Sequence, residues 1–251
     1  IGIGWAAPTI ALAGTEEQKA RYLDRIFTGE EFWCQMFSET EAGSDLANLG
    51  TRAVRDGDEY VVNGSKIWTS GGHKAQFGIL IARTDPDQPK HKGLTYFLLD
   101  MESEGVDVRP LHQITGEAEF NEIFLTDVRI PHDRVLGEVG NGWAVAVTTL
   151  MNERVALGGG VPKKGSGPIG DLVHLWGETR DSLDPVTRTV MRDRVTDLWS
   201  QAEALRLTNW RARETSKSGN PGPEGSVTKM MSAEMNQRIY ETCMDLLGAD
   251  G

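Results

Sequence analysis

The stretch Phe37-Ser38-Glu39-Thr40-Glu41-Ala42-Gly43-Ser44-Asp45 is a hydroxyl-rich turn with small residues near its centre. Gly43 frees the local backbone dihedrals, and Ser38 and Ser44 carry hydroxyls that can donate or accept hydrogen bonds. Small side chains at this point let a ligand come close to the backbone. A serine- and glycine-containing turn is also an ordinary connection between strands, so both interpretations stay open on the residues alone.

A second stretch, Lys66-Ile67-Trp68-Thr69-Ser70, places a large aromatic residue beside two hydroxyls at the end of a β-rich run. An aromatic plate next to polar turn atoms suits a flat, polar, conjugated cofactor. A tryptophan at a strand end is more often part of a hydrophobic core than the wall of a cofactor site.

Taken together, the two stretches resemble the motifs of the acyl-CoA dehydrogenase family, whose members are FAD enzymes that desaturate acyl-CoA thioesters. The resemblance is strong from about Gly14 to Gly159 and weaker from Asp184 to the end. Further phrases follow in the family's order: Asp107-Val108-Arg109-Pro110-Leu111, Thr115-Gly116, Phe120-Asn121-Glu122-Ile123-Phe124 and Asp127-Val128-Arg129-Ile130-Pro131. The family has Pro and Gly where this chain has Thr40 and Glu41, which puts the backbone contacts of that turn in question.

Composition limits the classes of protein that this chain can represent. With 39% apolar and 25% charged residues among 251, it has the composition of a soluble globular protein. The net charge of −11 argues against nucleic acid as a partner, since phosphate would be repelled. No apolar run is long enough to span a membrane, and the five histidines show no metal-ligand spacing. We therefore expect no metal and, by default, a cytoplasmic location.

The two cysteines, Cys34 and Cys243, lie far apart in apolar contexts, so they indicate packing residues and no disulfide framework. The chain begins in an apolar stretch without a leader and stops soon after Gly248. Both ends predict that this chain is a piece of a longer protein. We expect the piece to lack most of the family's N-terminal helical domain and its C-terminal end.

Three regions differ in their sequence pattern. Residues 1–30 are predicted to be helical, with Thr15 and Gln18 as a capping box. Residues 31–140 predict strands, including a hairpin around Asp56-Gly57-Asp58 and strands at 77–82, 94–99 and 120–125. Residues 141–251 predict helices at 142–157, from Pro185 after the Asp184 cap, and at 224–247, with a loop at 158–170.

The predicted fold class is therefore α+β and multidomain, like that of the acyl-CoA dehydrogenases. It has a remnant of the N-terminal helical domain at 1–30 and a central β-barrel or sandwich at 31–140. An incomplete C-terminal helical bundle occupies 141–251.

The resemblance also implies where FAD binds. Backbone and hydroxyl groups of the two turns would bond the ring edge, and the tryptophan would pack on the isoalloxazine. Ser44 would also lie near the substrate's CoA arm. The implied cofactor residues are Phe37, Ser38, Gly43, Ser44, Trp68, Thr69 and Ser70.

Glu153 is the carboxylate that we select as general base, because it follows an apolar helical stretch and a water-poor pocket raises a base's pKa toward neutrality. Its spacing alone favours a solvated helix carboxylate. In the family the catalytic glutamate occupies either this helix position or a loop near the C-terminus, which would lie beyond Gly251. Arg154 matches a family arginine near the substrate, or else forms a structural ion pair.

The resemblance implies an acyl-CoA dehydrogenase that removes a proton and a hydride from an acyl-CoA thioester and passes electrons to an electron-transfer flavoprotein. A homodimer or homotetramer is expected. An acyl-CoA oxidase or a flavin monooxygenase of the same fold is one alternative, and a non-catalytic binding module is the other. The acyl chain length is not specified by the sequence.

Overall fold

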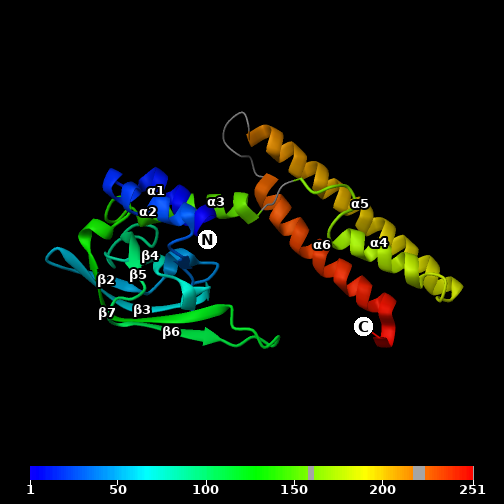
Figure 1. The fold of residues 1–251 in the computed structure, drawn as a ribbon, viewed down its shortest axis with the longest axis horizontal. Helices are drawn as coiled ribbons and strands as arrows, with labels where there is room; N and C mark the ends of the chain where they lie inside the picture. Colours follow the sequence, from blue (N-terminus) through cyan, green and yellow to red (C-terminus); the bar gives the residue numbers. More distant parts are fainter. Residues whose placement is uncertain (158–160, 217–223, 251) are drawn as a thin grey trace. The chain divides into compact units, whose positions relative to one another are not determined.

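The computed structural model describes residues 1–157, 161–216 and 224–250. The chain divides into two compact units, Ile1–Glu153 and Arg154–Gly251, and the division falls inside helix α3 (Gly142–Leu157). The domain limits proposed from the sequence put the last boundary at residue 141. Figure 1 labels the helices and strands of both units.

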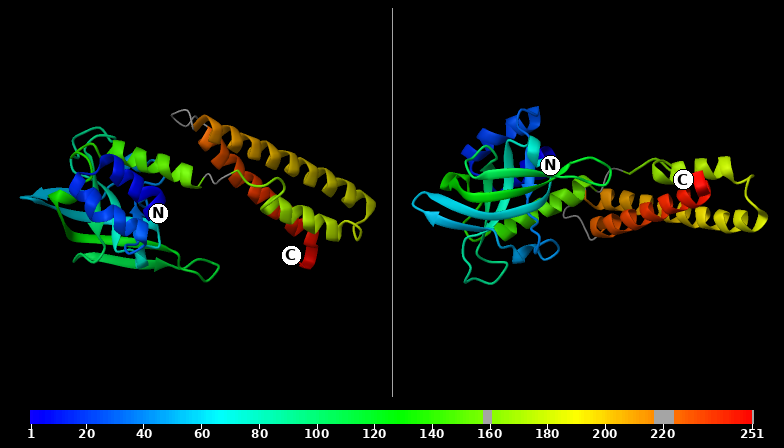
Figure 2. Two further views of the ribbon diagram at one scale, coloured as in Figure 1. Left: turned by 45° about the horizontal axis from the view of Figure 1, so that its top comes forward. Right: turned by 90° about the horizontal axis from the view of Figure 1, so that it is seen from below.

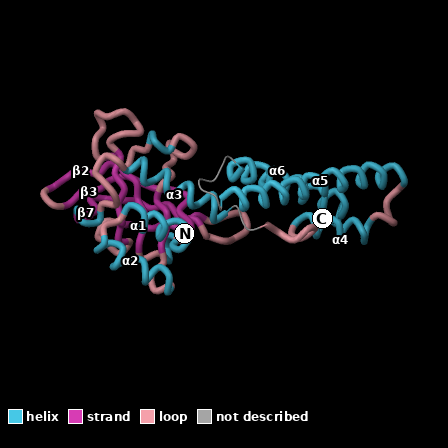
Figure 3. Tube along the Cα trace, turned by 90° about the horizontal axis from the view of Figure 1, so that it is seen from above, coloured by secondary structure: helices cyan, strands magenta, loops and turns pink. Residues whose placement is uncertain are grey.

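The first unit is built on a seven-stranded sheet, drawn in magenta in Figure 3. Its strand order is β1-β4-β2-β3-β7-β6, with β5 also paired to β4. The strands are β1 (Trp33–Met36), β2 (Arg52–Asp56), β3 (Glu59–Ser70), β4 (Phe77–Arg83), β5 (Leu94–Asp100), β6 (Val106–Leu111) and β7 (Phe120–Pro131). The fold class is thus α+β, as expected, with one curled sheet (Figure 2).

The hairpin predicted around Asp56-Gly57-Asp58 is confirmed, since β2 and β3 pair antiparallel on either side of it. Gly57 has a φ of 62°, a conformation that glycine adopts without steric cost. Two strands were not anticipated. β1 pairs in parallel with β4, and β6 pairs antiparallel with β7.

Two hydrophobic clusters lie on the two faces of the sheet, and β1 contributes to both. Trp33 belongs to the cluster shared with the helices, whereas Cys34 and Met36 belong to the cluster enclosed by the strands. The alternation is the period of two that a strand imposes. Phe37, directly after β1, returns to the helix side.

Helices α1 (Ala7–Ala13), α2 (Glu16–Thr28) and α3 pack along one side of this sheet (Figure 1). The predicted capping box at the start of α2 is confirmed, because Thr15 and Gln18 exchange side-chain and backbone hydrogen bonds. Gly29 ends α2 in the left-handed conformation.

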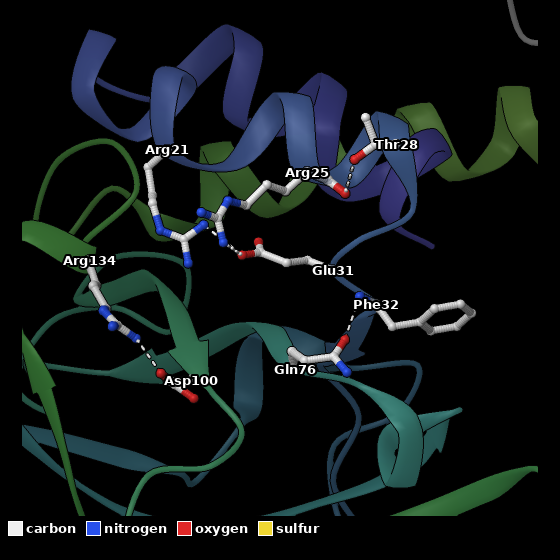
Figure 4. A network of polar contacts seen from close by, with 8 residues as sticks. All are labelled: Arg21, Arg25, Thr28, Glu31, Phe32, Gln76, Asp100 and Arg134. Atoms are coloured by element: carbon white, nitrogen blue, oxygen red, sulfur yellow. Dashed lines mark hydrogen bonds and ion pairs between the residues drawn. The ribbon is translucent and has the colours of Figure 1, made fainter.

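A polar network ties α2 to the sheet (Figure 4). The buried carboxylate of Glu31 accepts from Arg21 at 2.6 Å and from Arg25 at 3.5 Å. Next to it, the backbone N–H of Phe32 donates to Gln76 Oε1 at 2.6 Å. These bonds hold the entry to β1 in place.

A chain of buried hydroxyls joins α1, β5 and α3. Thr149 Oγ1 lies 2.8 Å from Tyr96 OH and 3.0 Å from Thr9 Oγ1, and all three residues are fully buried. Thr9 also donates to the carbonyl of Trp5 at 2.6 Å. Buried hydroxyls require such partners, so these hydrogen bonds fix the position of α3 along its axis relative to α1 and β5.

The second unit contains helices α4 (Pro168–Thr179), α5 (Pro185–Ser216) and α6 (Glu224–Leu247), which lie alongside one another in Figures 1 and 2. The cap at Asp184 is confirmed, as its Oδ1 accepts from the N–H groups of Val186 and Thr187. Helix α4 was not anticipated, and the loop predicted at 158–170 overlaps its first turn. Residues 158–160 of that loop lie outside the described residues.

Within the described ranges, none of the helices combines the length and the apolar content that crossing a bilayer requires.

Replacing Thr149 by Val should lower the free energy of unfolding by about 1–3 kcal/mol, because the buried hydroxyl of Tyr96 then loses its partner. Thr148→Val is the matched control, since the Thr148 hydroxyl bonds locally to the carbonyl of Ala144 at the surface. We expect a change within about 0.5 kcal/mol there. Denaturant unfolding measures both, and equal losses would contradict the role of the hydroxyl chain.

Candidate flavin and substrate site

The two stretches singled out in the sequence are bonded to each other directly. The N–H of Ile67 donates to the carbonyl of Ser38 at 2.9 Å. Lys66 sends its side chain, fully buried, to the carbonyl of Phe37 at 3.0 Å and to Glu39 Oε1 at 2.7 Å. The turn at 37–45 is therefore fastened to β3 beside Trp68.

Glu39 is the anion that balances this buried lysine. Its carboxylate also accepts from the backbone N–H groups of Gly50 at 2.6 Å and Thr51 at 3.0 Å. Burial alone would raise the pKa of Glu39, but the charge and the hydrogen bond of Lys66, with the bonds from Thr51 and Gly50, outweigh it and lower that pKa. Burial lowers the pKa of Lys66 to about 8, against the opposing effect of Glu39.

The turn itself is closed by two backbone bonds of 3.1 Å between Glu39 and Ala42. Thr40 and Glu41 form its exposed tip. The two positions that differ from the family motif therefore point away from the bonds that fasten the turn to β3.

Trp68 has an unusual backbone and an exposed ring. Its φ of 61° lies in the left-handed region, which is rare for a bulky residue. It sits at a bulge, since three steps along β3 from Lys66 to Thr69 match only two along β7. The side chain is 61% exposed and meets Phe120 edge-on at 6.0 Å. Strain of this kind concentrates at functional sites.

A cavity of about 170 Å³ in the first unit brings most of the predicted residues together. Phe37, Ser38, Trp68 and Ser70 line it, together with Glu153. The remaining lining residues are Ile1, Trp5, Gln35 and Ile67. The turn, the end of β3 and the helix carboxylate thus meet in one hollow.

Four predicted residues lie elsewhere. Gly43 and Ser44 are exposed and do not line the cavity. A Cβ at Gly43 would meet nothing within 4 Å, so the backbone there does not depend on glycine. Thr69 is buried and does not line the cavity. Arg154 belongs to the second unit, where it bonds Ser226 Oγ at 3.3 Å.

Glu153 reaches the cavity because of helical periodicity. Val145, Ala146 and Thr149 form the buried face of α3, and Glu153 follows Thr149 by one turn. The carboxylate therefore continues the packed face of the helix, and its Oε2 lies 3.5 Å from Gln35 Nε2.

Sequence reasoning missed Gln35, Trp5 and the Lys66–Glu39 pair. The signal for Gln35 was a single polar residue in the apolar run Phe32–Phe37. The ion pair joins residues 27 positions apart, so no short-range sequence pattern could predict it. Among the described residues, no three His, Cys, Asp or Glu side chains gather in a way that could hold a metal ion.

The residues of the cavity fit a flat, polar cofactor. Gln35 Oε1 is buried with no hydrogen-bond partner in the described part of the chain, which leaves an acceptor available beside the cavity. Ser38 and Ser70 add hydroxyls, and the exposed ring of Trp68 adds an aromatic surface. Polar groups that converge beside an aromatic surface are the kind of lining that fixes the orientation of such a cofactor.

Comparison with known proteins agrees with this architecture. The sequence model "Acyl-CoA dehydrogenase, middle domain" matches residues 34–128, and "Acyl-CoA dehydrogenase, C-terminal domain" matches residues 140–251. Between them the two matches cover most of the chain, which belongs to the acyl-CoA dehydrogenase family.

Two relatives from Mycobacterium tuberculosis carry that name. "Acyl-CoA dehydrogenase FadE34" is 44% identical over 98% of this chain, which spans 34% of that relative's length. "Acyl-CoA dehydrogenase IpdE1" is 39% identical over 97% of this chain, which spans 62% of it. The solved structure "Tcur3481-Tcur3483 steroid ACAD" is 33% identical with a TM-score of 0.83, over 98% of this chain and 63% of that one.

Lys66→Met should lower the free energy of unfolding by about 3–5 kcal/mol, because Glu39 keeps its charge and loses its buried partner. The double variant with Glu39→Gln should recover part of that loss, since no unpaired charge remains. Lys90→Met is the control: its pair with Asp45 is exposed, so we expect about 0–1 kcal/mol. Denaturant unfolding measures these free energies. Similar losses of stability at the two lysines would contradict a special role for the buried Lys66–Glu39 pair.

Acid should weaken the wild type through Glu39. Its folded-state pKa lies below the ordinary 4.5, so the unfolded chain binds this proton more readily. The stability contributed by ionised Glu39 is complete above pH 4.5 and is lost as the pH falls through the folded-state value. The stability difference between wild type and Glu39→Gln should therefore shrink as the pH drops below 4.5. A pH-independent difference would contradict this account.

Proposed function

We propose that this chain forms the flavin and substrate site of an acyl-CoA dehydrogenase, which introduces a double bond between the α and β carbons of an acyl-CoA thioester. The observation that carries the proposal is the single cavity shared by Phe37, Ser38, Trp68, Ser70 and Glu153. Family membership supports it, because two independent stretches of the chain match the family's domains.

FAD would be held by the two joined stretches. Ser38 and Ser70 offer hydroxyls to the ring edge, and Trp68 offers its exposed face. When bound, FAD supplies the acceptor for the hydride that leaves the β carbon. Thr69, Gly43 and Ser44 remain proposed contacts that follow from the family motif alone. The same holds for the approach of Ser44 to the CoA arm and for Arg154 as a substrate residue.

Glu153 would act as the general base. Its carboxylate takes the proton from the α carbon, and the electron pair of that C–H bond becomes the new double bond as the β hydride departs. Glu153 stands at the end of a packed helix face and lines the cavity together with Phe37 and Trp5.

The substrate class and the partners belong to the same proposal. A solved relative whose printed name includes the word steroid is 33% identical, so a bulky polycyclic acyl group is the first to be tested. Electrons would pass to an electron-transfer flavoprotein, and a homodimer or homotetramer is the expected assembly.

Glu153→Gln in the intact protein should keep FAD bound but slow flavin reduction by at least about a thousandfold, because the amide cannot take the α proton. The experiment adds a panel of straight-chain, branched and steroid acyl-CoA thioesters anaerobically and follows the loss of the oxidised flavin band. Glu104→Gln, an exposed carboxylate outside the cavity, serves as the control and should react like the wild type.

The outcomes separate the competing functions. Flavin that no acyl-CoA reduces would defeat the dehydrogenase proposal and favour a binding module. Reduction followed by rapid oxygen consumption would indicate an oxidase. Near-normal reduction by Glu153→Gln would move the base to another carboxylate.

A further inference from the structure

Gln35 is a polar residue on an otherwise apolar face of β1. Trp33 and Phe37, two positions before and after it, are both buried in the cluster shared with the helices. A strand that alternates cleanly would place an apolar residue at position 35 as well. A residue that breaks the local pattern without serving the core is a candidate for function.

The side chain of Gln35 lines the cavity and bonds the proposed base. Its Nε2 lies 3.5 Å from Glu153 Oε2, while its Oε1 is buried and has no partner among the residues described. Only the nitrogen of an amide donates and an ionised carboxylate only accepts, so the nitrogen must face Glu153. The oxygen is thereby left as an acceptor.

Both ends of this contact are carried by anchored elements. Gln35 sits opposite Ile79 in the β1–β4 ladder. Glu153 stands one helical turn after Thr149, which the buried hydroxyls of Tyr96 and Thr9 hold in place. The separation between amide and carboxylate is therefore set by the sheet and the helix together and not by loop residues.

We propose that Gln35 is a positioning residue that links the base to the cofactor: its N–H holds the Glu153 carboxylate at the cavity, and its oxygen accepts an N–H of the bound flavin ring. The inference rests on the proposed function. A donor to the carboxylate favours the ionised base. A flavin N–H would satisfy the buried oxygen, whose isolation is otherwise costly.

The test compares Gln35→Leu and Gln35→Glu in the intact protein. Leu removes both the donor and the acceptor, whereas Glu keeps an accepting oxygen and adds a negative charge beside Glu153. The pH profile of anaerobic flavin reduction should move by about one pH unit to higher pH in Gln35→Leu and further in Gln35→Glu, because both changes disfavour the ionised base. FAD affinity, measured by flavin fluorescence on titrating the apoprotein, should fall about three- to tenfold in Gln35→Leu.

Gln113→Leu is the matched control. The oxygen of Gln113 is also buried without a partner in the described residues, but it lies outside this cavity. It should leave the pH profile and the FAD affinity unchanged. A thermal melt of each variant reports whether it folds, and Gln35→Glu, which keeps the size of the side chain, remains available if Gln35→Leu does not.

The results distinguish a failure of the proposed function from a failure of the proposed role of Gln35. If no acyl-CoA reduces the wild-type flavin, the proposed function fails, and the FAD titration still tests the accepting oxygen. If the wild type is reduced and both Gln35 variants keep its pH profile, the link to the base is overturned. An unchanged FAD affinity in Gln35→Leu would overturn the link to the flavin.

Discussion

The buried ion pair between Lys66 and Glu39 is the contact on which the site depends. A lysine taken wholly out of water needs a carboxylate and a further acceptor, and here these are Glu39 and the carbonyl of Phe37. Meeting that requirement forces the turn at 37–45 against β3. The same requirement brings Ser38 and Trp68 to one cavity. Ser38 lies between Phe37 and Glu39, the two residues that the lysine contacts, and Trp68 follows Ile67, whose N–H donates to the carbonyl of Ser38.

Glu153, the proposed base, is brought to that cavity by other contacts. Helix α3 is located by apolar packing of Val145 and Ala146 and by the hydroxyl chain through Thr149. Glu153 follows from the helical repeat alone. Two independent anchors, one ionic and one built of hydroxyls, therefore converge on a small volume, and catalytic geometry of the proposed kind requires that rigidity.

Local signals predicted local structure well. The capping box at Thr15, the hairpin at Gly57 and the cap at Asp184 are all short-range hydrogen-bond patterns, and each appears where the residues indicated. Helix α4 was not predicted from the sequence because Gly170 and Gly177 weaken its helical pattern. Gly170 is nevertheless required, since a Cβ there would come within 2.6 Å of the Gly165 carbonyl.

What the sequence could not disclose was long-range. The sequence showed the turn and the tryptophan as motifs. It did not show that Lys66 joins them or that Gln35 faces Glu153. Strand β1 was missed for the same reason: its partner β4 begins 44 residues later, at Phe77, in a parallel pairing that leaves no turn signal. Gly43 and Ser44 belong to the motif, yet the structure of the chain alone leaves both outside the cavity.

The left-handed backbone of Trp68 also bears on how this protein tolerates change. Glycine would occupy that φ without steric cost, and a buried ring would gain more from packing than one that is 61% exposed. By stability alone, tryptophan is a poor choice at position 68. Selection or design for thermal robustness would tend to replace it, and so to discard the aromatic surface. Stability and the proposed flavin contact are therefore opposed at this one residue, and engineering of the chain should hold it constant.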